Sequence, residues 1–178
     1  MNGTRSATAK TALLLIVLGA ITWLGGINVR AAAGFSLLQF GTLEFKPNIH
    51  PNIERAVFSL LAQSSLILNV AYIVLILASA VYLRSARWDF RKEGWLMIAA
   101  ILLYVFVPVE IYTMVLDIRM WLLDASGSND LVEFRKLFIH RLAALSGVPM
   151  IALLSYYTAI ALVVFRPLRR QGASRTAP

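Results

Sequence analysis

The side chain with the clearest chemical potential is Glu110, which lies in a long apolar run from Gly94 to Leu116. Three other runs, Thr11–Val29, Ala56–Leu83 and Leu142–Phe165, have the length and apolar character of a membrane span, and Glu110 is the only charged residue in any of these four runs. An ionisable group inside a membrane segment is costly unless it has a partner or a function. We therefore expect one of three roles. Glu110 is a hydrogen-bonded group that fixes helix register, a site for a proton, a cation, a quinone or a lipid headgroup, or a contact with a neighbouring subunit.

Other polar residues fall near the depth of Glu110 when the apolar runs are aligned as helices that rise about 1.5 Å per residue. Three lie at nearly the same level and a fourth lies about two turns deeper, so we predict a buried polar layer made of Glu110, Gln63, Ser146, Thr22 and Asn69. Pro108 and Pro149 lie close to this level. Because proline removes a backbone hydrogen bond, both are predicted to kink their helices there.

The two histidines, His50 and His140, are predicted on the same side of the membrane, near the starts of two helices. Two histidines at one level can ligate a haem b or a copper ion. No spacing motif links them, so contact with a partner or with the membrane interface is the favoured interpretation, and no cofactor is predicted. The sequence has no cysteine, which excludes disulfides and cysteine-based metal sites.

Motifs of catalysis do not occur in the sequence. There is no glycine-rich nucleotide loop and no His-Glu-x-x-His metalloprotease motif, and no hydrolase or kinase signature. The prediction is therefore a protein that is not an enzyme.

The elements that must position these residues are membrane helices. Hydrophobic residues make up 59% of the chain, against roughly 45–50% in soluble domains. A span needs roughly 20 apolar residues, and four runs qualify. We predict an all-α polytopic membrane protein with one domain, an antiparallel bundle of four transmembrane helices at about residues 11–29, 56–83, 94–116 and 137–165.

The distribution of charge predicts the orientation of this bundle. If both termini are on one side, that side holds ten basic residues against Asp89 and Glu93, whereas the other side holds seven basic and six acidic residues. Basic residues gather on the cytoplasmic side, so both termini are predicted to be cytoplasmic, in an inner membrane of bacterial type. The net charge of +8 is thus assigned to orientation rather than to nucleic acid. The residues expected at lipid headgroups are Arg84, Arg87, Arg91, Lys92, Arg166, Arg169 and Arg170.

Two connecting segments have unusual composition. The outer loop, residues 30–55, is too apolar for a solvated loop and too short to span, so it is predicted to lie at the interface or to dock a partner. Its apolar residues are Phe35, Leu37, Leu38, Phe40, Leu43 and Phe45. The basic tail, residues 166–178, is expected at anionic headgroups.

Local patterns predict three further features. Gly19, Thr22 and Gly26 form a small-residue stripe for close packing, either inside the bundle or against a second copy. A polar face on the second span carries Ser65, Asn69, Tyr72 and Ser79. One of Ser128, Asn129 and Asp130 is expected to cap a short helix that leads into the last span.

These features favour a non-catalytic membrane subunit that scaffolds, assembles or stabilises a larger complex of the energy-conversion or transport type. Its expected partners are the lipid bilayer and other membrane subunits. One alternative is a small proton- or ion-coupled transporter or channel-like protein that uses Glu110. A second alternative is a membrane redox protein with a bis-histidine haem.

Overall fold

The computed structural model describes residues 7–85 and 93–167. Four stretches are long and apolar enough to cross a membrane, namely Ala7–Phe35, Pro51–Ser85, Gly94–Ala125 and Leu131–Phe165. The described residues form no β-strand, and one isolated bridge joins Leu38 to Phe45. The prediction of an all-helical chain with four candidate spans is confirmed, and the four apolar helices indicate an integral membrane protein.

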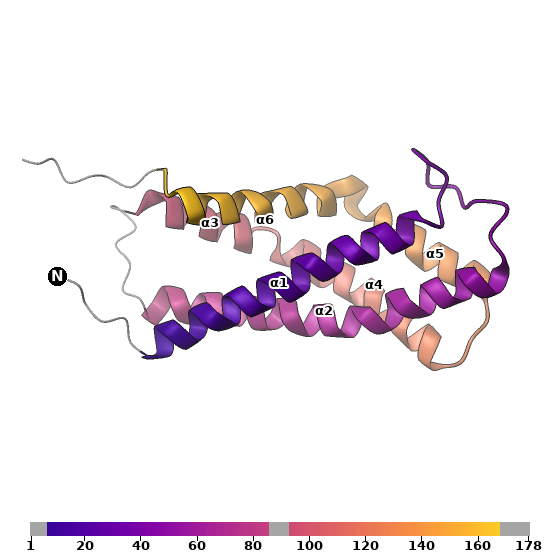
Figure 1. Cartoon of the computed structure of the whole chain (residues 1–178), viewed down its shortest axis with the longest axis horizontal. Helices are drawn as coiled ribbons and strands as arrows, with labels where there is room; N and C mark the ends of the chain where they lie inside the picture. Colours follow the sequence, from indigo (N-terminus) through magenta and orange to yellow (C-terminus); the bar gives the residue numbers. More distant parts are fainter. Residues whose placement is uncertain (1–6, 86–92, 168–178) are drawn as a thin grey trace, which may run out of the picture.

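Helices α1 (Ala7–Phe35) and α2 (Pro51–Ser85) pack against each other along their length (Figure 1). A Cβ atom added to Gly19 would lie 3.1 Å from the carbonyl oxygen of Ala71, and one added to Gly26 would overlap the side chain of Leu68. Small residues allow this close approach of two backbones, which drives helix packing in lipid. The small-residue stripe at Gly19 and Gly26 therefore packs inside the chain.

The third candidate span is broken in two, as α3 (Gly94–Tyr104) and α4 (Val107–Ala125). Pro108 lies in the first turn of α4, directly after the break. This position tolerates proline because its missing N–H would have no partner within the helix.

The fourth candidate span is also broken, into α5 (Leu131–Leu142), a short 3₁₀ turn η1 (Ala144–Gly147) and α6 (Val148–Phe165). Leu145 and Ser146 have left-handed φ angles of 50° and 54°, and Gly147 follows with φ of 88°. Three consecutive left-handed residues end the helix, and Pro149 lies in the first turn of α6.

The broken spans pack differently from α1 and α2. Helix α3 lies against α6, whereas α4 lies against α2 and α5. Figure 1 shows that α1 begins and α6 ends at the same end of the molecule, opposite the loop 36–50. We call the first end the terminal end and the second the loop end.

Two apolar clusters form the core. Trp23 packs on Tyr72 and Tyr156 with ring centroids 4.7 and 4.9 Å apart, and this cluster joins α1, α2 and α6. Near the loop end, Phe58 of α2 stacks on Phe134 of α5 at 5.5 Å. The polar face predicted on the second span is buried, and its members are Ser65, Asn69, Tyr72 and Ser79.

The loop 36–50 is partly folded into the core. Leu37 and Leu38 are buried, and backbone hydrogen bonds from Gln39 to Glu44 and from Lys46 to Leu37 close a small hairpin. Phe40 lies at the tip of this hairpin and is fully exposed. Only part of the apolar composition of this loop therefore faces outward.

The turn between α4 and α5 follows the sequence prediction. Asp130 is the N-cap residue of α5, and its carboxylate accepts hydrogen bonds from the backbone N–H groups of Val132 and Glu133 at 3.0 and 3.2 Å. This satisfies two of the donors that a helix start leaves without partners.

Candidate functional site

Two ion pairs join α2 to α4 and α5 at the loop end. Glu54, in the first turn of α2, accepts two hydrogen bonds from Arg135 of α5 at 2.5 and 2.6 Å. Its neighbour Arg55 donates to Asp124 of α4 at 2.7 Å. The fork of an arginine matches a carboxylate well, so these pairs hold the start of α2 against α4 and α5 beyond the apolar part of the bundle.

A third charged cluster lies deeper, around Asp117 of α4. Arg30 of α1 donates to both carboxylate oxygens, at 2.9 and 3.2 Å. Arg141 of α5 donates from Nε to the Oδ1 that Arg30 also contacts, at 2.6 Å. The Asp117 side chain is only 3% exposed. One buried carboxylate thus holds two guanidinium groups from two different helices.

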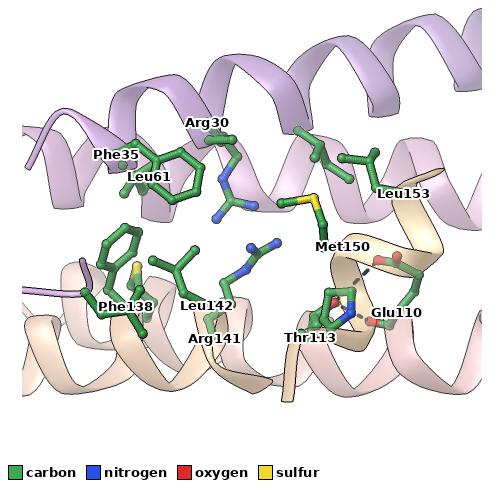
Figure 2. Close-up of a pocket in the computed structure, with 17 residues that line it drawn as sticks. Arg30, Phe35, Leu61, Glu110, Thr113, Phe138, Arg141, Leu142, Met150 and Leu153 are labelled. Atoms are coloured by element: carbon green, nitrogen blue, oxygen red, sulfur yellow. Dashed lines mark hydrogen bonds between the residues drawn. The ribbon is translucent and has the colours of Figure 1, made fainter. Parts of the chain in front are cut away.

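A cavity of about 230 Å³ lies beside this cluster. Figure 2 shows the guanidinium groups of Arg30 and Arg141 pointing toward each other within it, with Glu110 and Thr113 at one side. Most of the remaining wall is apolar, and it includes Ile27, Phe35, Leu61, Phe138, Leu142, Met150 and Leu153. We call this space the arginine cavity.

Glu110 reaches the arginine cavity because of the break in front of α4. The break places Glu110 in the first turn of that helix, where the side chain is buried. The hydroxyl of Thr113 donates to the carbonyl oxygen of Glu110 at 3.0 Å and lies 3.4 Å from Oε2. Gly147 and Pro149 from the second break also line the cavity, so the first turn of α4 and the second break meet at this site.

The polar layer predicted around Glu110 is only partly assembled. Glu110 and Asn69 are buried, whereas the side chains of Thr22, Gln63 and Ser146 are exposed. Thr22 is one residue before the buried Trp23, about 100° around the helix, so it faces away from the core.

Gln63 and Ser146 lie outside the buried polar layer for different reasons. The side-chain nitrogen of Gln63 lies 3.4 Å from the carboxylate of Asp124. Asp124 follows Glu110 by fourteen residues on the same broken span, so α2 is shifted along α4 relative to the alignment that the sequence predicted. Ser146 is in the left-handed break, where counting by helical rise fails.

The two histidines have separate neighbours. Nδ1 of His50 accepts from the backbone N–H of Asn52 at 3.3 Å, and Nε2 of His140 lies 3.0 Å from the hydroxyl of Tyr112. Both are exposed. Within residues 7–85 and 93–167, no group of three metal-ligating side chains comes together.

The basic residues predicted at lipid headgroups are only partly described. Arg84 and Arg166 are exposed at the terminal end, and the Arg166 guanidinium lies 5.3 Å from the ring centroid of Trp95. The remaining five lie outside the described residues, and they are Arg87, Arg91, Lys92, Arg169 and Arg170.

The three charged residues at the centre of the site were not predicted from the sequence. Arg30, Asp117 and Arg141 were counted among the charges of the outer side, because Arg30 and Asp117 follow the ends of apolar runs and Arg141 precedes one. Helical spacing carries a usable signal, however. Thr113 and Asp117 follow Glu110 by three and seven residues, so all three share one helix face.

A second, larger cavity of about 440 Å³ lies toward the terminal end, between the α1–α2 pair and the α3–α6 pair. Its wall is almost wholly apolar. Its few polar groups include Ser79 and Tyr104, whose hydroxyls are 2.6 Å apart. Arg166 also lines it, and the rest of the wall suits an apolar group.

Comparison with protein-family models, with curated proteins and with solved structures gives no match.

Proposed function

We propose that this chain is a non-catalytic integral membrane subunit that scaffolds, assembles or stabilises a larger membrane complex of the energy-conversion or transport type. In this proposal the four spans form an antiparallel bundle in a bacterial-type inner membrane, with both termini in the cytoplasm. The loop 36–50 is then on the outer face. The positive-inside rule supports this orientation, since the excess of basic residues belongs to the terminal side of the sequence.

The observation that carries the proposal is the exposed tip of the loop hairpin. Leu37 and Leu38 fix the base of the hairpin in the core, so its position is set by packing. Phe40 and Leu43 nevertheless point outward, and Phe40 is fully exposed. A large apolar side chain held outside the core by an ordered turn is typical of a surface that contacts a partner or the bilayer interface.

Purification in a mild non-ionic detergent tests this function. We expect the chain to co-purify with another membrane protein in a fixed ratio, and Phe40→Ser to abolish this. Phe165→Ser is the matched control, because Phe165 is also exposed but lies at the terminal end of α6, and it should leave the complex intact. A chain recovered alone, monomeric and stable would contradict the proposal.

The second candidate function is a small proton- or ion-coupled transporter. It is favoured by one observation: Glu110, in the first turn after one helix break, and Gly147, in the other break, line the same cavity. Broken membrane helices that face a cavity are a common way to build transport sites. An acidic side chain at such a break has the chemistry to carry a proton.

The substitution Glu110→Gln separates the two candidates. Loss of ion or proton flux in vesicles with an intact complex would support transport, whereas loss of the complex would support the scaffold. Glu133→Gln is the matched control, because Glu133 lies on α5 away from the cavity and pairs only loosely with Lys136 at 3.6 Å. It should change neither readout.

A further inference from the structure

The two arginines of the arginine cavity share one carboxylate. Their guanidinium groups converge there, and both contact Asp117. Glu110, which lines the cavity, balances the formal charge of the site, but it is hydrogen-bonded by Thr113 and forms no ion pair with either arginine within the described residues. Each guanidinium therefore keeps N–H donors for a further oxyanion.

Arg30 also has an unused donor. Its side chain is nine-tenths buried, and its Nε atom has no hydrogen-bond partner in the described part of the chain. Arg141 uses Nε toward Asp117, which leaves its two terminal nitrogens for another acceptor. Buried donors are almost always paired in folded proteins. Nε of Arg30 is such a donor, and together with the terminal nitrogens of Arg141, whose side chain is 25% exposed, it marks where an acceptor group would bind.

The shape of the cavity indicates a small head attached to an apolar chain. Its volume of about 230 Å³ is far above the roughly 10–15 Å³ that one water molecule needs. Beyond the charged end the wall is mainly apolar, and Phe35, Leu43 and Met150 are exposed where they border it. An apolar chain that left the cavity along these residues would lie against the bilayer.

We propose that the arginine cavity binds an amphiphile with an oxyanion headgroup, either the phosphate of an anionic lipid or the carboxylate of a fatty acid, with the oxyanion between Arg30 and Arg141. Guanidinium groups bind phosphate and carboxylate alike, through N–H donors that match pairs of oxygen atoms. The ligand is held by arginines of two helices, α1 and α5. Phe40 does not line this cavity, although Leu43 of the same hairpin does.

Ligand-dependent thermal stability of the full chain in maltoside micelles tests the proposal. We expect phosphatidylglycerol or palmitate to raise the midpoint of unfolding, because a ligand that binds only the folded state stabilises it. The headgroup that gives the larger rise identifies the source of the oxyanion. Phosphatidylcholine should give little rise. Inorganic phosphate should also give little, since it lacks the apolar chain.

Variants separate the arginine site from general lipid binding. Arg141→Gln should weaken the apparent affinity about tenfold or more, and Arg141→Lys should fall between it and the wild type because it keeps the charge and loses the fork. Lys136→Gln removes an exposed charge from the same helix and should have no effect. Each midpoint shift is measured against that variant's own ligand-free protein, so a loss of basal stability does not mask the result.

The role of Glu110 gives a further check. Glu110→Gln should bind the anionic amphiphile as well as or better than the wild type, because it removes a negative charge from the wall. Weaker binding in Glu110→Gln would overturn the proposal. Three other results would also overturn it: a midpoint shift with phosphatidylcholine equal to that with phosphatidylglycerol, a shift in Arg141→Gln equal to that of the wild type, or a full shift with inorganic phosphate alone.

Discussion

Asp117 holds together the charged centre of the molecule. It accepts hydrogen bonds from Arg30 and Arg141, which lie on α1 and α5 and otherwise face each other as like charges. In a region of low dielectric this repulsion is much stronger than in water. The carboxylate therefore keeps three helices in register as well as satisfying two arginines.

Replacing Asp117 by Asn should destabilise the folded chain by about 3–5 kcal/mol, because it leaves two guanidinium groups without a counter-charge. Unfolding in mixed micelles with increasing dodecyl sulfate measures this cost. The control is Glu133→Gln, which removes one partner of an exposed ion pair and should cost about 0.5 kcal/mol or less. Equal losses in the free energy of unfolding would show that the buried cluster contributes no more to stability than the exposed ion pair.

Individual residues were predictable from the sequence to different degrees. Glu110 stands out because it is the one charge inside an apolar run, and the structure buries it. Asp117 was hidden because it follows the end of that run, where a charge normally faces headgroups. In the fold, Arg30 and Arg141 compensate the free-energy cost of burying this carboxylate. They are 87 and 24 residues away from it in the sequence, so an average of hydropathy over neighbouring residues cannot detect them.

Among the elements, α1 and α2 illustrate packing without a hydrophobic driving force. Lipid is as apolar as leucine, so contact between helices depends on close approach of their backbones. Gly19 supplies that approach, since an added Cβ would meet the carbonyl oxygen of Ala71 and the Cβ of Leu75. Neither of these atoms can move by a side-chain rotation.

Gly19→Val should therefore separate the two helices and cost about 1–3 kcal/mol, as expected for overpacking. Gly25 provides a matched control on the same helix, because an added Cβ would meet no atom within 4 Å there. Gly25→Val should leave stability within about 0.5 kcal/mol of the wild type. The same unfolding titration measures both, and a Gly19→Val protein as stable as Gly25→Val would contradict the packing described above.

The elements were predicted well where one local rule decides them. Four apolar runs predicted four spans, and polar turn chemistry predicted the cap at Asp130. The second break was only half predicted. Pro149 indicated a kink, but Leu145 and Ser146 have no preference for left-handed backbone, which costs roughly 1–2 kcal/mol per residue. No local sequence pattern predicts this conformation.

At the scale of the whole molecule, charge is distributed unevenly between the two ends. Ion pairs occupy most of the charged side chains at the loop end, where Glu54, Asp124 and Asp117 bind arginines, although Lys46 and Arg119 are exposed on that side. The terminal end of the described chain shows Arg84 and Arg166 exposed. Paired charges offer little attraction to an anionic membrane surface, whereas unpaired basic side chains are attracted to it. This contrast is the physical basis for the orientation we propose.

Labelling of single cysteines tests that orientation directly, because the natural sequence has no cysteine. Thr42→Cys and Asn129→Cys lie in exposed segments of the loop end, and Ser85→Cys and Pro167→Cys lie at the terminal end. With a membrane-impermeant maleimide on intact spheroplasts, we expect the first two variants to react and the last two to react only after permeabilisation. The four positions control for one another, since each end is sampled by two separate segments. If Ser85→Cys and Pro167→Cys reacted in intact spheroplasts, the bundle would be inverted. The hairpin tip at Phe40 would then face the cytoplasm, and any partner that docks on it would have to be sought there.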